Sequence, residues 1–98
     1  MAAHFKILIH RSSDTLHLKL VGDFDGTSAY ELINIIKKYS NGFGRIFIHT
    51  NGLKQVFDFG RRVFQNAFPA ISDHSVRFIF TGQAGRQLAP EGCRLAYG

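Results

Sequence analysis

The hydrophobic periodicity of the chain switches repeatedly between strand-like and helical, and this alternation is what most restricts the fold. Residues 4–10 and 16–22 carry apolar side chains at every second position, the period of a half-buried β-strand. The turn-forming run "RSSDT" separates the two segments. Together they predict a β-hairpin at the start of the chain.

Helical and strand-like segments alternate after the hairpin, beyond the turn "GDFDG". Ser28 and Glu31 form a capping-box signature, which predicts a helix from Ser28 to about Tyr39. A second helix is expected near residues 59–68, ended by Pro69, and a short third helix at 83–89. Apolar runs at 45–50 and 76–82 predict strands covered on both faces, with a loop over 51–57.

The expected order is therefore ββαβαβα. Strands that alternate with helices indicate a partly parallel sheet with right-handed crossovers. We predict an α/β sandwich with a mixed sheet, opened by the hairpin and carrying its helices mainly on one side. A chain of 98 residues is long enough for one such domain.

Composition limits the classes of function. No apolar run approaches the roughly 18 residues that a membrane span needs, and the N-terminal residues do not form a signal peptide. The single cysteine, Cys93, excludes an internal disulfide and a cysteine-rich zinc site. These features favour the cytoplasm.

The net charge of +5 points to acidic partners. Between Lys37 and Arg62 six basic residues stand against one acid, Asp58. A nucleic-acid binder is one hypothesis, although aromatic residues do not alternate with basic ones along the sequence as on a stacking platform.

No catalytic group of residues emerges, so an enzyme is not expected. The five histidines are scattered, and His49, expected to end the third strand near the following loop, has no nucleophile to activate. Two imidazoles facing each other across the hairpin, His10 and His17, would make a weak metal site. The stretch "TGQAGRQLAPEG" lacks the Lys-Ser/Thr of a P-loop. We expect no metal and no cofactor; a small-ligand or nucleotide sensor remains an alternative.

Two stretches, "GDFDGTSAYEL" and "GLKQVFDFG", resemble the STAS family of sulfate-transporter and anti-sigma-factor-antagonist domains. The first resembles the family's G-E-L-D turn and the T-A-x-x-L that opens its first helix. The resemblance spans roughly residues 14–90 and treats residues 1–98 as one STAS-like domain. It gives four residues a turn or fold role: Gly22, Asp23, Asp25 and Ser28.

The second stretch aligns with the family's loop G-V-x-F-I-D-S-S-G, which leads into the second helix. In the antagonist branch the first Ser of this loop is phosphorylated by a partner kinase. Here Asp58 takes that position, with Phe57 and Phe59 on either side, while Gly60 is kept. The resemblance implies docking to an anti-sigma factor or a sensor-kinase-like protein. No hydroxyl remains in the loop, so the usual phosphorylation switch should be absent.

Three interpretations of Asp58 stay open. It caps the second helix, it supplies a fixed negative charge in place of a phosphoserine, or it belongs to a contact loop anchored by Phe57 and Phe59. Arg61 and Arg62 either pair with Asp58 or engage an acidic partner. The expected partner-binding residues are Lys54, Phe57, Asp58, Phe59, Gly60, Arg61 and Arg62. The sequence leaves open whether the hairpin edge supports a homodimer.

Overall fold

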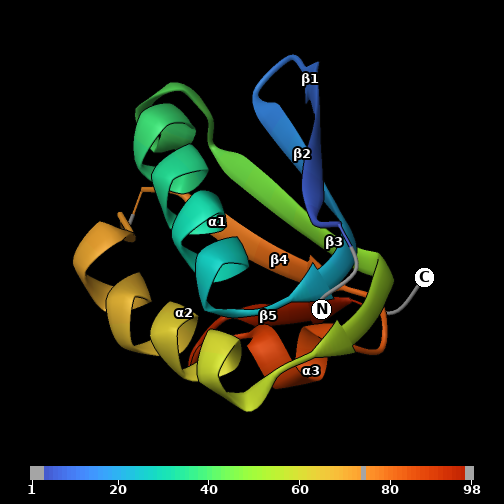
Figure 1. Ribbon diagram of the computed structural model, residues 1–98. Coiled ribbons are helices and arrows are strands. Elements are labelled where there is room, and N and C mark those ends of the chain that lie inside the picture. Colours follow the sequence, from blue (N-terminus) through green and yellow to red (C-terminus); the bar gives the residue numbers. More distant parts are fainter. Residues whose placement is uncertain (1–3, 74, 97–98) are drawn as a thin grey trace.

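A five-stranded mixed sheet forms the centre of the protein (Figure 1). The computed structural model describes residues 4–73 and 75–96. The strands are β1 (Lys6–Ser12), β2 (Thr15–Phe24), β3 (Arg45–Val56), β4 (Arg77–Thr81) and β5 (Arg94–Ala96). The helices are α1 (Gly26–Tyr39), the short 3-10 turn η1 (Ser40–Gly42), α2 (Asp58–Ile71) and α3 (Gly85–Leu88).

The strands lie in the sheet in the same order as in the sequence. The β1–β2 hairpin is antiparallel, as predicted, and the three following pairs are parallel. Because parallel crossovers are right-handed and each one steps in the same direction across the sheet, the connecting helices fall on one face. Figure 1 shows α1 and α2 side by side on that face, which confirms the predicted α/β architecture.

Alternate residues of the central strands face the helices and form the core. Leu16, Leu18 and Leu20 of β2 are fully buried, and Ile46, Ile48, Phe78 and Phe80 continue this layer on β3 and β4. Phe64 of α2 lies at the centre, with its ring centroid 6.2 Å from that of Phe24 and 6.0 Å from that of Phe80. Leu32 and Ile36 pack against the same layer from α1.

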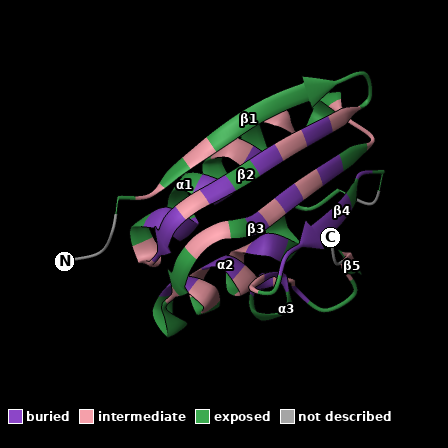
Figure 2. Ribbon diagram, turned by 90° about the vertical axis from the view of Figure 1, so that its right-hand side faces the viewer, coloured by how far each residue is buried: buried purple, intermediate pink, exposed green. Residues whose placement is uncertain are grey.

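The opposite face of the sheet carries no helix among the described residues, and Figure 2 looks onto it. We call it the open face. Phe47 and His49 of β3 lie on it and are only half-buried. The prediction that residues 45–50 are covered on both faces was therefore wrong, because the strand order places all crossovers on one side.

The start of α1 differs from the expectation. Asp25, not Ser28, is the N-cap residue, and its carboxylate accepts a hydrogen bond of 2.9 Å from the backbone N–H of Ser28. Ser28 lies in the first turn, where its hydroxyl donates to the carbonyl oxygen of Asp23 at 2.9 Å. The prediction of a capping box at Ser28 was wrong. The helix begins earlier, and the Asp25 carboxylate makes the capping hydrogen bond to the backbone N–H of Ser28.

Three other boundaries also differ. Helix α2 passes Pro69 and ends at Ile71, since Phe68 and Ile71 both pack on the core and outweigh the hydrogen bond that a proline lacks. Strand β3 continues to Val56 through the expected loop, paired with β2. Strand β5 was not predicted, and it extends the order to ββαβαβαβ. No helix within the described ranges is long and apolar enough to cross a membrane.

Candidate docking site

The predicted partner-binding loop lies where β3 ends and α2 begins, beside the end of β2. The backbone N–H of Phe57 donates to the carbonyl oxygen of Phe24 at 2.9 Å, which ties the loop to β2. Gly60 is buried, and a Cβ at this position would lie 2.6 Å from the carbonyl oxygen of Asp25. Gly60 therefore allows α2 to approach the start of α1, and it offers no side chain to a partner.

Two phenylalanines flank the start of α2 and face solvent. Phe59 is 68% exposed and Phe57 is 40% exposed. The Phe59 ring lies over Gly26, where an added Cβ would come within 2.8 Å of the ring. An exposed aromatic pair of this kind is enriched in protein interfaces, where rings fill pockets of the partner.

Asp58 carries the negative charge of the loop and pairs with both neighbouring arginines. Its carboxylate accepts a hydrogen bond from Arg61, one turn further along α2, and lies 2.9 Å from Arg62 Nη2. The hydrogen bond from Arg61, followed by the charges of Arg61 and Arg62, lowers the pKa of this exposed carboxyl below its usual value. Asp58 therefore stays ionised at neutral pH.

Asp58 is the first residue of α2 rather than its cap. Phe57 occupies the N-cap position, and no side chain makes the capping hydrogen bond there. The capping interpretation was wrong, because the Asp58 carboxylate turns toward the arginines. The charge still lies in the first turn, where the helix dipole favours it. The predicted pairing of Arg61 and Arg62 with Asp58 is confirmed, and exposed pairs of this kind contribute little to stability because the solvent screens them.

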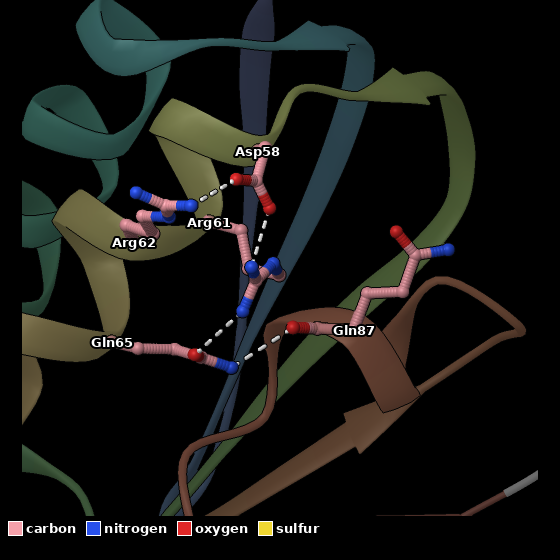
Figure 3. A network of polar contacts seen from close by, with 5 residues as sticks. All are labelled: Asp58, Arg61, Arg62, Gln65 and Gln87. Atoms are coloured by element: carbon pink, nitrogen blue, oxygen red, sulfur yellow. Dashed lines mark hydrogen bonds and ion pairs between the residues drawn. The ribbon is translucent and has the colours of Figure 1, made fainter.

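A short polar chain links this site to α3 (Figure 3). Arg61 donates to Gln65 Oε1 at 3.2 Å, and Gln65 Nε2 donates to the carbonyl oxygen of Gln87 at 2.9 Å. Neither glutamine was expected to take part. Gln65 and Gln87 belong to two helices that are far apart in the sequence, so residue spacing does not predict the contact between them.

Lys54 lies beside a separate small cavity. The cavity has a volume of about 300 Å³ and lies between the end of β3 and the turn that leads into α3. Thr50 and Lys54 line one side, and Gln83 and Gln87 the other. The "TGQAG" turn therefore does border a pocket, as the ligand-sensor hypothesis requires. Gly82 shapes the turn with a φ of +90°.

The residues given a turn or fold role have structural positions at the end of β2. Gly22 has a φ of +99°, and a Cβ there would come within 2.1 Å of the His4 carbonyl oxygen. Asp23 is buried near the end of β2. Asp25 accepts hydrogen bonds from Ser28, and these bonds lower the pKa of its carboxyl. These residues hold the start of α1 in place.

The histidines do not join this site. His49 lies in the middle of β3 on the open face, so the expectation that it ends the strand near the loop was wrong. Its Nε2 lies 2.9 Å from His17 Nδ1, and its Nδ1 lies 2.7 Å from Thr81 Oγ1. Within the described residues no group of three or more His, Cys, Asp or Glu side chains could hold a metal ion.

Comparison with known proteins supports the fold. No protein-family profile and no curated protein sequence matches the chain. Among solved structures, the anti-sigma factor antagonist SpoIIAA in its unphosphorylated form matches with a TM-score of 0.67 at 13% identity, over 95% of this chain and 87% of that one. A serine-to-glutamate variant of RsbS from Moorella thermoacetica matches with a TM-score of 0.69 at 16% identity, over the same shares of 95% and 87%.

A third structure, that of Mglu, matches with a TM-score of 0.66 at 17% identity, over 88% of this chain but 20% of that one. At these identities the likeness concerns the fold. The protein therefore has a STAS-like α/β fold, as the resemblance in its sequence implied.

Proposed function

We propose that the protein is a single, non-catalytic STAS-type interaction domain of bacterial regulation, which docks another regulatory protein in the cytoplasm. The docking surface is the loop around Asp58 together with the first turns of α2. The observation that carries the proposal is the exposed pair Phe57 and Phe59 on either side of an ionised carboxylate. The likeness to an anti-sigma factor antagonist supports the choice of partner class.

The partner would be an anti-sigma factor or a sensor-kinase-like protein with an acidic surface. Arg62 and Lys54 are exposed near the loop, and Arg61 is half-buried beside Asp58. Binding of an acidic partner would redirect the arginines from Asp58 at little cost, because the pairs are exposed. The loop has no hydroxyl, so the site works as a constant contact surface without a serine switch.

An affinity experiment with matched variants tests this proposal. The wild type, two variants of the docking loop and its helix (Arg62→Glu and Phe59→Ser) and Tyr30→Ser serve as baits in a lysate of the native host, at equal folded concentration. Tyr30 is 60% exposed on α1, so its variant is a control for the loss of an exposed ring. A regulatory protein that binds the wild type and Tyr30→Ser, but neither variant of the loop and its helix, supports the proposal when the purified pair shows the same order of affinities. Equal capture by all four baits contradicts it.

The cavity beside Lys54 favours a second candidate, a small-ligand or nucleotide sensor. Pockets that bind small ligands begin at about 300 Å³, so this one lies at the lower limit. A thermal shift caused by a nucleotide and abolished by Lys54→Ala would support the sensor. The exposed edge of β1 adds a homodimer hypothesis, which light scattering of the purified protein at several concentrations would test.

A further inference from the structure

The open face of the sheet gathers positive charge that is dispersed in the sequence. Strand register aligns Arg45 of β3 with Arg77 of β4, and Ile79 of β4 with Arg94 of β5. The same register puts Lys19 of β2 and Lys6 of β1 on this face. All five cationic side chains are exposed.

No acidic side chain occupies a paired strand position beside these cations, although Asp73 and Glu91 border a hollow that Arg45, Arg77 and Arg94 also line. None of the paired positions that share the open face with these cations, from Lys6 and Lys19 to Arg94, is Asp or Glu. Asp23 follows a register shift near the end of β2 and is buried. Within residues 4–73 and 75–96, no carboxylate forms an ion pair with Arg45, Arg77 or Arg94.

A row of planar rings crosses the same face. His10, His17 and Phe47 occupy register-matched positions on β1, β2 and β3. The rings of His17 and Phe47 are nearly parallel, 16° apart, with centroids separated by 4.9 Å. The ring of His49 is 7° from that of His17, with a centroid distance of 5.2 Å. The rings of His17, Phe47 and His49 therefore face one another, and together with exposed His10 they lie on the same face as the basic residues.

Hydrogen bonds hold this ring cluster in position. His17, His49 and Thr81 form a chain across three strands, with contacts of 2.9 and 2.7 Å. With both imidazoles neutral, each contact uses one proton, so the chain is satisfied in either direction. The rings are fixed before any ligand arrives, which reduces the entropy cost of binding.

We propose that the open face is a second binding surface, independent of the Asp58 loop, that takes a single-stranded polynucleotide, with its phosphates on the arginines and lysines and its bases against the ring row. Single strands bind to surfaces that combine a positively charged track with aromatic rings, because unpaired bases are free to stack. Sheets with aromatic residues on an uncovered face bind RNA in this manner.

Other occupants fit this face less well. In a dimer through this face, the five cationic side chains of one copy would lie opposite the same five of the other copy. Repulsion between these like charges opposes such a dimer. Duplex DNA keeps its bases stacked away from a flat sheet. A hollow of about 770 Å³ adjoins the face at β4 and β5, and its walls include Arg45, Arg77 and Arg94. Its other walls include Asp73 and Glu91, so the expected phosphate path stays on the sheet side.

Fluorescence anisotropy with labelled oligo(dT) and oligo(U) of twelve nucleotides tests the proposal and shows whether DNA or RNA binds more tightly. We expect a dissociation constant of about 1–100 µM near physiological salt. With five phosphate contacts, the logarithm of the association constant should fall with the logarithm of the salt concentration, with a slope no steeper than about −3.5. Heparin, a duplex of equal length and phosphatidylserine vesicles are the competing probes.

Two charge-reversal variants form the matched pair. Arg45→Glu/Arg77→Glu changes the open face, while Lys37→Glu/Lys38→Glu makes the same charge change on exposed positions of α1. The first should weaken binding by roughly tenfold or more, the second by much less. Phe47→Leu and His10→Ala should each weaken binding by several-fold through lost contact between the bases and the ring row. His10 is exposed, so its loss leaves the fold intact.

Thermal melting confirms that each variant is folded. The proposal is overturned if neither oligonucleotide binds below about 100 µM at 50 mM salt. It is equally overturned if both charge reversals weaken binding to the same extent, or if neither ring variant has an effect. Preferential binding to heparin, duplex or vesicles would also contradict it, because those probes present charge without free bases.

Discussion

Gly60 is the position at which α2 passes over the end of β2 and the start of α1, and Gly60→Ala should therefore destabilise the protein. A Cβ at this position would lie 2.6 Å from the carbonyl oxygen of Asp25 and 2.8 Å from that of Phe24. Ordinary C···O contacts begin near 3.3 Å, so the overlap is roughly 0.7 Å. Both atoms belong to the backbone, so they cannot turn aside as a flexible side chain would.

Two opposing free energies set the size of the effect. Alanine in place of glycine favours a helix by at most about 1 kcal/mol. Forcing one carbon into a packed contact costs typically 1–3 kcal/mol, and here the shift of α2 also disturbs buried Phe64. We expect a net loss of about 1–2 kcal/mol in the free energy of unfolding, which lowers Tm by about 5–15 °C for a chain of this size.

Urea unfolding followed by circular dichroism, together with thermal melting, measures this loss. Gly42→Ala is the matched control, because a Cβ at Gly42 meets nothing within 4 Å and the residue lies on the surface. That variant should stay within about 0.5 kcal/mol of the wild type. A Gly60→Ala protein that is as stable as the wild type would show that the close approach of α2 to α1 has been misjudged.

Three further outcomes are expected. Asp25→Ala removes the cap of α1 and should cost about 1 kcal/mol at neutral pH, measured by urea unfolding. Hydrogen bonds from Ser28 lower the pKa of Asp25, so the difference from the wild type should shrink as pH falls below 3.8 toward the lowered pKa of the folded state. Burial, followed by the charges of His17 and Lys19, lowers the pKa of His49 below 6.5, so the folded state favours the neutral ring. The stability of the wild type should be complete above pH 6.5 and decline below it, and His49→Gln should flatten the curve of Tm against pH. Burial raises the pKa of the Cys93 thiol, so iodoacetamide should alkylate it more slowly at pH 8 than it alkylates the same chain in urea, and equal rates would refute the burial.

The sequence predicted the long elements because each shows its period over several residues. The hairpin and both long helices follow from period two and period 3.6. The crossover rule favoured helices mainly on one side, but only the strand order of the structure places all of them there. Strand β5 has only three residues, too few to display a period. Gly52 in the sequence suggested a loop, but β3 continues through Gly52 to Val56. The strand can continue because its register with β2 shifts and the pairing is kept.

The candidate docking site could be predicted in part. Asp58, Arg61 and Arg62 stand at i, i+3 and i+4, a spacing that predicts ion pairs on any helix. The burial of Gly60 could not be predicted, since it depends on the approach of Asp25 from a different element. The open face could not be predicted either, because strand register alone aligns Arg45 with Arg77.

The strand order also has a consequence for how the chain folds during its synthesis. Each strand pairs with the strand that precedes it in the sequence, so every new strand joins a free edge and none is inserted between two formed neighbours. The β1–β2 hairpin is local, and each later addition closes a single crossover, which limits the loop-closure entropy to one loop at a time. The strand order therefore requires no separation of paired strands when a later segment is synthesised, at about 5–20 residues per second. Only the three residues of β5 remain to be added when the layers of the core are already complete.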